Sequence, residues 1–351
     1  MTVRLPENLN LKPFVLVVTV AALLVAVLAT YESRTFDWPP YVEEPPELSA
    51  YGQLRSLLIF ALSGLILWGL QRTGEGRRHL VSERQRVGWA GLISVFLASA
   101  FVAVFVWNPA HFNRLALEDG PVEWASAAAL FLSCAIFLFL AGRLRRRGGP
   151  GHRPAAALAL AFAVGCFVIG MEELSWMQRQ LGFDTPAFLA RNYQSEANFH
   201  NLLTDIAENI YYLGAFVFLI GLPYLCEAWR LVPAGYWLSL FVPRRRTVLI
   251  AAPLVGFNYD MWNVIPIQVA FFLTLMILAD YAREAWRSDR FSAVVIALVL
   301  AAVVLPQAVF LANGTNLVRV WDPTEYKELF IPLALLVHAL RMSAALRQPR
   351  R

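Results

Sequence analysis

Residues 291–312 read FSAVVIALVLAAVVLPQAVFLA, a stretch without a single charged side chain. An α-helix needs about 20 mostly apolar residues to cross the hydrocarbon core of a bilayer. This stretch is therefore typical of a transmembrane helix. Because comparable apolar stretches recur from one end of the sequence to the other, we expect residues 1–351 to form a single integral membrane domain.

The composition agrees with a membrane location and excludes several classes of function. The chain has 351 residues, of which 58% are hydrophobic and 16% charged, whereas a soluble domain carries about 25% charged residues. The net charge of +5 does not come from a soluble basic patch, so we expect no nucleic-acid partner. The sequence also has no glycine-rich phosphate loop with its lysine, so we expect no bound nucleotide. The expected partner is the lipid bilayer.

Ten apolar stretches predict an all-α fold, a polytopic bundle of about ten transmembrane helices. Their ranges are 13–30, 55–70, 88–107, 122–142, 154–172, 207–226, 247–257, 262–279, 291–312 and 328–344. The first is too long for the apolar core of a signal peptide, so we expect it to be retained. The seventh is short. Residues 247–280 therefore form either two tight helices with a turn at 258–260 or one long helix.

The charges of the loops predict the orientation of the chain. Cytoplasmic loops collect Arg and Lys, and with ten spans most of the 30 basic residues fall on one side of the membrane. Nine spans would move the cluster of Arg283, Arg287 and Arg290 to the other side. We therefore predict ten spans, cytoplasmic N- and C-termini and a bacterial inner-membrane location. Most of the 25 acidic residues then lie on the outer face.

The densest polar region lies between the fifth and sixth predicted spans. It reads EELSWMQRQLGFDTP over residues 172–186 and NYQSEANFHN over residues 192–201. Acids at the end of an apolar helix are costly unless they are paired or hydrated. If the helix continues, Glu172, Ser175, Trp176 and Arg179 share one face by i+3 and i+4 spacing. Glu172 would then neutralise Arg179 and leave Glu173 on another face.

A second helix is expected to follow this loop. Glu196 and His200 are i, i+4 neighbours on it, and a carboxylate one turn from an imidazole binds a divalent metal or works as a base with its orienting group. A second face carries Asn201, Asp205, Glu208 and Tyr212. An alternative stays open, in which these side chains only solvate and cap the loop.

Further polar residues stand near other predicted helix ends. Glu118 and Asp119 precede the fourth span in a turn, and Glu123 suits the first turn of a helix, so capping explains this group well. Asp260 lies at the tip of the predicted hairpin. A structural role in the turn and a functional role as an acid are equally open for it. The acidic residues at 322–328 precede the last span, and we interpret them mainly as a cap of that helix. His338 falls inside that span, where we favour a neutral, hydrogen-bonded core histidine over a functional one.

Together these observations define the candidate site on the outer face. The predicted catalytic residues are Glu173, His200, Asp119 and Glu196. The predicted substrate-binding residues are Glu172, Trp176, Gln178, Arg179, Asn198, Asn201 and Asp260. If a metal is bound, its ligands come from Glu118, Asp119, Glu173, Glu196 and His200. An oxygen-rich set of this kind favours Mg²⁺ or Mn²⁺ over zinc.

The motif itself resembles one from known sequences. The pattern E-E-x-S-W-x-Q-R-x-x-G-F-x-T-P at residues 172–186 is followed by N-x-H-N at residues 198–201. With the turn at Glu118, Asp119 and Gly120, it resembles a family of bacterial multi-pass membrane proteins without an assigned activity. The resemblance covers about 100 residues. It implies a membrane fold and adds no chemistry.

Three functions are compatible with this pattern. The leading hypothesis is a membrane enzyme that acts on a lipid or a lipid-linked sugar at the outer face. Inner-membrane glycosyltransferases that use lipid-phosphate donors share this general design, which is an analogy of fold only. The first alternative is a transporter or channel with an acidic outer vestibule. The second is an assembly or scaffold protein whose polar loops form a docking surface.

Overall fold

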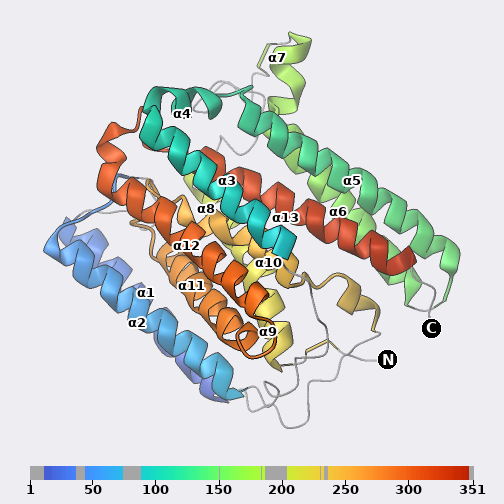
Figure 1. Cartoon of the computed structure of the whole chain (residues 1–351), viewed down its shortest axis with the longest axis horizontal. Coiled ribbons are helices and arrows are strands. Elements are labelled where there is room, and N and C mark those ends of the chain that lie inside the picture. Colours follow the sequence, from blue (N-terminus) through green and yellow to red (C-terminus); the bar gives the residue numbers. More distant parts are fainter. Residues whose placement is uncertain are drawn as a thin grey trace.

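The computed structural model describes residues 12–36, 44–73, 88–149, 151–182, 184–185, 204–229, 231–232 and 236–347. The regular elements within these ranges are helices, and no strand occurs in them. Figure 1 shows them as a bundle of long helices that run side by side.

Nine helices in the described part of the chain are long and apolar enough to cross a membrane. Helices α8, η4 and α9 follow one another without a break and make up one of these nine. The nine are α1 (Lys12–Phe36), α2 (Ala50–Thr73), α3 (Gly88–Trp107), α5 (Pro121–Arg147), α6 (His152–Glu173), α8 (Thr204–Phe216) with η4 (Val217–Gly221) and α9 (Leu222–Trp229), α11 (Ile265–Ala285), α12 (Arg290–Asn313) and α13 (Asp322–Arg347).

The helices form a layered arrangement in which helices pack both on their neighbours in the sequence and on helices far apart in it. α1 packs on α2, α2 on α11, α11 on α12 and α12 on α3. On the other side, α13 packs on α5, and α5 packs on α6. In Figure 1 the pair α1 and α2 covers one flank of the bundle, and the pair α5 and α6 covers the opposite flank. The predicted all-α polytopic fold is confirmed in this form.

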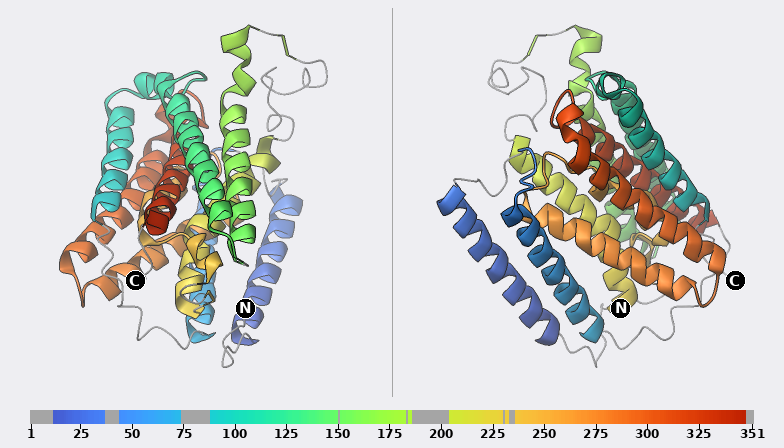
Figure 2. Two further views of the ribbon diagram at one scale, coloured as in Figure 1. Left: turned by 90° about the vertical axis from the view of Figure 1, so that its right-hand side faces the viewer. Right: turned by 60° about the vertical axis from the view of Figure 1, so that its left-hand side comes forward.

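Charged side chains separate toward the two ends of this bundle. The end that carries Asp119, Asp260 and Asp322 is called the acidic end below. The opposite end is called the basic end, and there the Arg147 guanidinium donates to the Leu346 carbonyl at 2.5 Å, which joins the ends of α5 and α13. The short helix α4 (Pro109–Leu115) lies at the acidic end, as does α7 (Gln178–Leu181), which stands beyond the ends of α5 and α6 (Figure 2).

A short, broken segment runs through the middle of the bundle. It consists of α10 (Arg245–Ala251) and η6 (Ala252–Gly256), and it packs against α13, α12 and α3. Every residue from 247 to 262 is buried. The segment is too short to count among the nine long helices. Its turn at residues 257–264 precedes α11, so of the two sequence-based alternatives the pair of helices is correct.

The ends of this central segment touch both ends of the bundle. Arg245 donates to the carboxylates of Glu227 at 3.0 Å and Glu284 at 2.7 Å, both at the basic end. At the other end, the Asn258 N–H donates to the Gln307 side chain at 3.1 Å, toward the acidic end of α12. A Cβ at Gly256 would lie 2.5 Å from the Val303 carbonyl oxygen. Glycine therefore lets η6 approach the α12 backbone.

Candidate functional site

The motif at residues 172–186 forms a sharp left-handed turn rather than a continuous helix. α6 ends at Glu173, and Ser175, Trp176 and Met177 have φ values of 45°, 55° and 62°. Left-handed backbone is unfavourable for residues other than glycine. The predicted shared face of Glu172 and Arg179 is therefore wrong, and the described residues contain no ion pair between them. Instead, the Trp176 indole N–H donates to the Glu172 carboxylate at 2.5 Å.

The turn folds back onto the loop before α5, where it builds a surface cluster of Glu118, Asp119, Arg179 and Gln180. Arg179 forms ion pairs with Glu118 and, at 3.2 Å, with Asp119. The Gln180 side-chain amide donates to Asp119 at 2.6 Å. Each of the three charged side chains is more than one third exposed. The structure thus brings together Glu118, Asp119 and Arg179, which the sequence places about 60 residues apart.

One more residue of the predicted substrate set, Gln178, is placed by this turn, and Glu123 lies close to it. The Gln178 side-chain amide donates to the Thr185 hydroxyl at 2.8 Å. The backbone N–H of Asp119 donates to the Glu123 carboxylate, and Glu123 lies in the first turn of α5, as predicted, although the N-cap Gly120 receives no side-chain hydrogen bond. Glu123 therefore connects the surface cluster with the helix ends below it.

Below the surface cluster lies a glutamate cluster formed by Glu123, Glu173, Glu325 and Glu328. It draws on the ends of α5, α6 and α13. Glu173 interacts electrostatically with the carboxylates of Glu328, Glu123 and Glu325. Glu325 interacts in the same way with Glu123 and Glu328. All four side chains are partly buried and keep some exposure. Carboxylates that crowd together repel one another, and sharing protons or binding a cation relieves this repulsion.

Tyr211 and Tyr212 on α8 border the glutamate cluster. The Tyr212 hydroxyl lies 2.5 Å from the Glu328 carboxylate and 3.2 Å from the Glu208 carboxylate. This contact agrees with the prediction that Glu208 and Tyr212 share a helix face. The Tyr211 hydroxyl is buried close to the charges of Glu173 and Glu328, with no hydrogen-bond partner among the described residues.

A buried lysine network continues inward from Tyr212; it consists of Tyr212, Asn258, Asp260, Thr324 and Lys327. Lys327 is 0% exposed, and its Nζ lies 3.6 Å from the centroid of the Tyr212 ring. The same ammonium donates to the Asn258 side chain at 3.2 Å. Lys327 therefore joins α8, α13 and the central segment.

Asp260 is the acid of this network and is almost completely buried, at 1% exposed. The Thr324 hydroxyl lies 2.7 and 2.9 Å from its two carboxylate oxygens. Burial raises the pKa of Asp260 above its usual value, although the positive charge of Lys327 and the hydrogen bond of Thr324 oppose the rise. Asp260 is thus a buried, tightly bonded acid rather than part of an exposed loop tip.

The start of α13 holds residues that sequence reasoning assigned to a helix cap. Asp322 is fully buried and accepts from the Asn113 amide at 2.8 Å and the Arg319 guanidinium at 2.7 Å. The same turn places Glu325, Lys327 and Glu328 in the clusters described above. The sequence did contain one signal for them, since Lys327 is one of only two lysines in the chain and directly precedes the last predicted span.

Several predicted site residues lie outside the described residues. They are Glu196, Asn198, His200 and Asn201. The side chain of Asp205 is not described either. Within the described ranges, no three His, Cys, Asp or Glu side chains are arranged to hold a metal ion. The proposed metal set therefore remains a prediction that depends on Glu196 and His200.

His338 lies in the core, as predicted, and is 0% exposed. The rings of Phe137, Phe162 and Phe218 surround it, with centroids 6.0 to 6.4 Å away. It lies in α13 three helical turns or more beyond Lys327, so it is not part of the clusters at the acidic end.

The fold and the site define the class of protein: a multi-pass, α-helical membrane protein with clusters of acidic side chains at one end of its bundle. Comparisons of the chain with protein families, with curated proteins and with solved structures find no match.

Proposed function

We propose that the chain is a membrane enzyme that acts on a lipid or a lipid-linked sugar at the acidic end of the bundle. The observation that carries this proposal is the glutamate cluster, in which Glu173 faces the charges of three other carboxylates at the ends of three membrane helices. Clustered carboxylates in unequal surroundings supply an acid and a base from the same residue type. Their depth at the helix ends corresponds to the level of lipid headgroups.

We assign the role of general base to Glu173 in this proposal. Glu123 is held by the backbone of Asp119, and Glu328 contacts Tyr212. Glu173 stands directly before the left-handed turn, and strained backbone of this kind concentrates at active sites. Asp119 remains a second candidate for the base or a metal ligand. Glu196 and His200 would complete the site from the loop that follows, with His200 orienting the substrate.

Arg179 fits a bracing role better than the phosphate-binding role suggested by its position in the motif. Both Glu118 and Asp119 already neutralise it, and a phosphate would have to displace one of them. We therefore assign Arg179 to holding the turn against the loop before α5.

The orientation that accompanies this proposal has ten crossings. The central segment α10–η6 would supply the crossing beyond the nine long helices, because its ends contact the basic end and the acidic end. The basic end would then face the cytoplasm of a bacterial inner membrane by the positive-inside rule. A fluorescent protein fused after residue 351 should fluoresce, and alkaline phosphatase fused after residue 118 should be active. The reverse result would overturn this orientation.

The enzymatic proposal is tested by mass spectrometry of whole-cell lipids and lipid-linked glycans. The strains are wild type, a deletion, and the deletion complemented with the wild-type chain, Glu173→Gln or Glu47→Gln. Glu47 is a partly exposed acid near the same end, outside the clusters, so it is the matched control. We expect a species that changes on deletion and is restored by wild type and Glu47→Gln but not by Glu173→Gln. Restoration by Glu173→Gln, at equal amounts of folded protein, would remove Glu173 from the catalytic role.

A transporter is the second candidate, because the lysine network lies on a broken segment in the middle of the bundle. Broken helices at membrane depth often form the substrate sites of transporters. In this alternative, a substrate or ion would pass from the glutamate cluster to Asp260 and Lys327. Flux into proteoliposomes under an imposed gradient, lost in Asp260→Asn, would support it. An unchanged lipid profile in every strain together with such a flux would replace the enzymatic proposal.

A further inference from the structure

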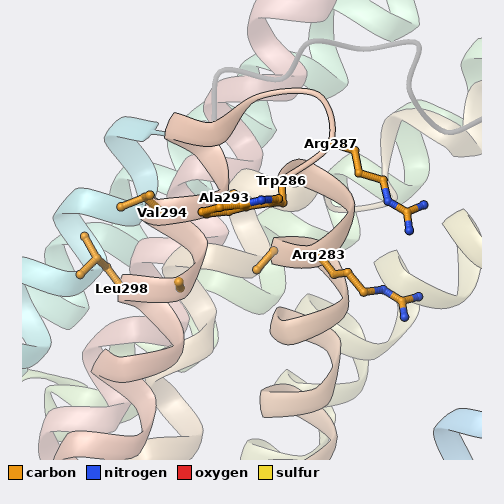
Figure 3. A pocket seen from close by; sticks show the side chains of 8 residues that line it. Arg283, Trp286, Arg287, Ala293, Val294 and Leu298 are labelled. Atoms are coloured by element: carbon orange, nitrogen blue, oxygen red, sulfur yellow. The ribbon is translucent and has the colours of Figure 1, made fainter.

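A groove lies at the basic end, far from the clusters at the acidic end. It is formed by the last turns of α11 and the first turns of α12 and has a volume of about 480 Å³. The small side chains create the hollow because they leave space unfilled, and the larger apolar side chains form its walls. Its lining is Ala282, Arg283, Trp286, Arg287, Ala293, Val294, Ala297 and Leu298. Figure 3 shows the Trp286 ring lying across from α11 toward Val294 on α12.

The apolar walls of this groove are open to the surroundings of the bundle. Trp286 is 59% exposed, Val294 48% and Leu298 43%. These residues stand on membrane-spanning helices, so the surrounding medium at this depth is lipid. An exposed tryptophan near the end of a span is typical of the membrane interface. The groove is therefore shaped and placed to hold an acyl chain or the glycerol region of a phospholipid.

Three arginines lie beside the groove, and two of them, Arg283 and Arg287, belong to its lining. Arg283 stands in the last turn of α11 and Arg287 in the turn that follows, and Figure 3 shows both side chains pointing to the same side, away from Val294 and Leu298. The Arg290 guanidinium lies 6.0 Å from the centroid of the Trp286 ring. Arg283 is 73% exposed, and its only close acid in the described residues is Asp280, at 3.6 Å.

The acidic residues of this region also have partners other than the arginines beside the groove. Asp280 accepts from the Tyr224 hydroxyl at 3.0 Å, and Glu284 accepts from Arg245 at 2.7 Å. Asp289 caps α12 by accepting from the backbone N–H groups of Phe291 and Ser292. These bonds hold the three carboxylates against other groups, whereas Arg283 and Arg287 stay exposed, so their guanidinium groups are open to contact with a headgroup.

We propose that this groove binds an anionic phospholipid from the leaflet at the basic end. Its acyl chain lies against Trp286, Val294 and Leu298, and its phosphate contacts Arg283 and Arg287. Basic pockets between membrane helices on the cytoplasmic side are suited to anionic headgroups. A second copy of the chain fits less well, because its own arginines would bring like charges together. Soluble phosphate fits less well too, since it leaves the apolar walls uncovered.

The test is native mass spectrometry of the purified protein in detergent with added lipid. Wild type should retain phosphatidylglycerol at least several-fold more than phosphatidylcholine. The double change Arg283→Gln and Arg287→Gln should remove this preference. The matched control is Arg145→Gln with Arg146→Gln, two exposed arginines at the same end on α5, away from the groove. The control should keep the preference. Equal retention of both lipids by wild type, or equal losses in both double variants, would overturn the proposal.

A second variant distinguishes lipid binding in the groove from general attraction of the lipid to positive charge. Ala297→Phe would fill the groove and leave every arginine in place, so it should also lower phosphatidylglycerol retention several-fold. Unchanged retention in this variant would show that charge alone attracts the lipid and would overturn the groove. The same spectra report subunit number, and a dimer lost in the arginine variant would replace the lipid with a second copy as occupant. Each variant is first checked for a wild-type size-exclusion profile.

Discussion

The ammonium of Lys327 lies over the ring of Tyr212, 3.6 Å from its centroid. This contact links the two halves of the acidic end. The Tyr212 hydroxyl reaches the glutamate cluster through Glu328, and Lys327 reaches the central segment through Asn258. Cation–π contacts contribute about 2 kcal/mol when they are shielded from water. This pair thus connects the partly exposed glutamates with the buried turn that carries Asn258.

Replacing Lys327 with methionine should destabilise the protein strongly. The change removes the positive charge that acts on buried Asp260, and an uncompensated buried charge costs about 3 kcal/mol or more. The expected result is a lower melting temperature in detergent. The double variant Lys327→Met with Asp260→Asn should recover part of the loss, because the stranded charge is gone. If the single and double variants melt together, the loss comes from packing rather than charge.

Asp260 should make stability depend on pH in a defined direction. Burial raises the pKa of Asp260 in the folded state, whereas an unfolded Asp has a pKa of about 4. The folded protein therefore binds this proton more tightly, so the stability it contributes is present below the unfolded pKa and is lost as pH rises through the folded pKa. The melting temperature of wild type minus that of Asp260→Asn should fall with rising pH in this window and then level off. A difference that rises with pH would contradict the assignment.

Gly256→Ala should loosen the packing of the central segment. The new Cβ would lie 2.5 Å from the Val303 carbonyl oxygen, so η6 and α12 would have to separate. Overpacking of this kind costs about 1–3 kcal/mol. The matched control is Gly214→Ala in α8, where an added Cβ meets no atom within 4 Å. Thermal unfolding in detergent should show a loss for Gly256→Ala only. Equal behaviour of the two variants would mean that η6 does not press on α12.

Arg179→Gln should change stability little. Its ion pairs with Glu118 and Asp119 are partly exposed, and exposed pairs contribute at most about 1 kcal/mol. The melting temperature should stay close to that of wild type. Any loss of the lipid species that depends on the chain would then come from displacement of the turn after α6. A large drop in melting temperature would show instead that Arg179 is a main support of the fold.

The sequence predicted the helical fold well because long apolar stretches carry that information locally. Residues 88–107 were predicted as a span and form α3 (Gly88–Trp107). The central segment was harder to predict, because it is only about half as long as a membrane-spanning helix. Its burial on all sides explains why so short a segment is stable inside the bundle. Even so, the turn near residue 258 was placed correctly.

The candidate site was predicted only in part. Glu118, Asp119 and Arg179 were singled out separately, but their pairing depends on a left-handed turn that i+4 spacing could not indicate. The contributions of Glu325, Lys327 and Glu328 were missed, because the start of α13 reads as an ordinary cap. Contacts between α8, α13 and the central segment are set by tertiary packing, and a single sequence carries no direct sign of them.

The central segment also has a consequence for how the chain is assembled. α10 and η6 together are too short and too broken to partition stably into lipid by themselves, and they begin beside Arg244, Arg245 and Arg246. Of their partners, α3 is synthesised earlier, whereas α12 and α13 are synthesised later. We therefore expect the segment to complete its packing only when residues up to about 347 have emerged. In that order of events, the last step of assembly is the closing of α12 and α13 around a segment that is already in place beside α3.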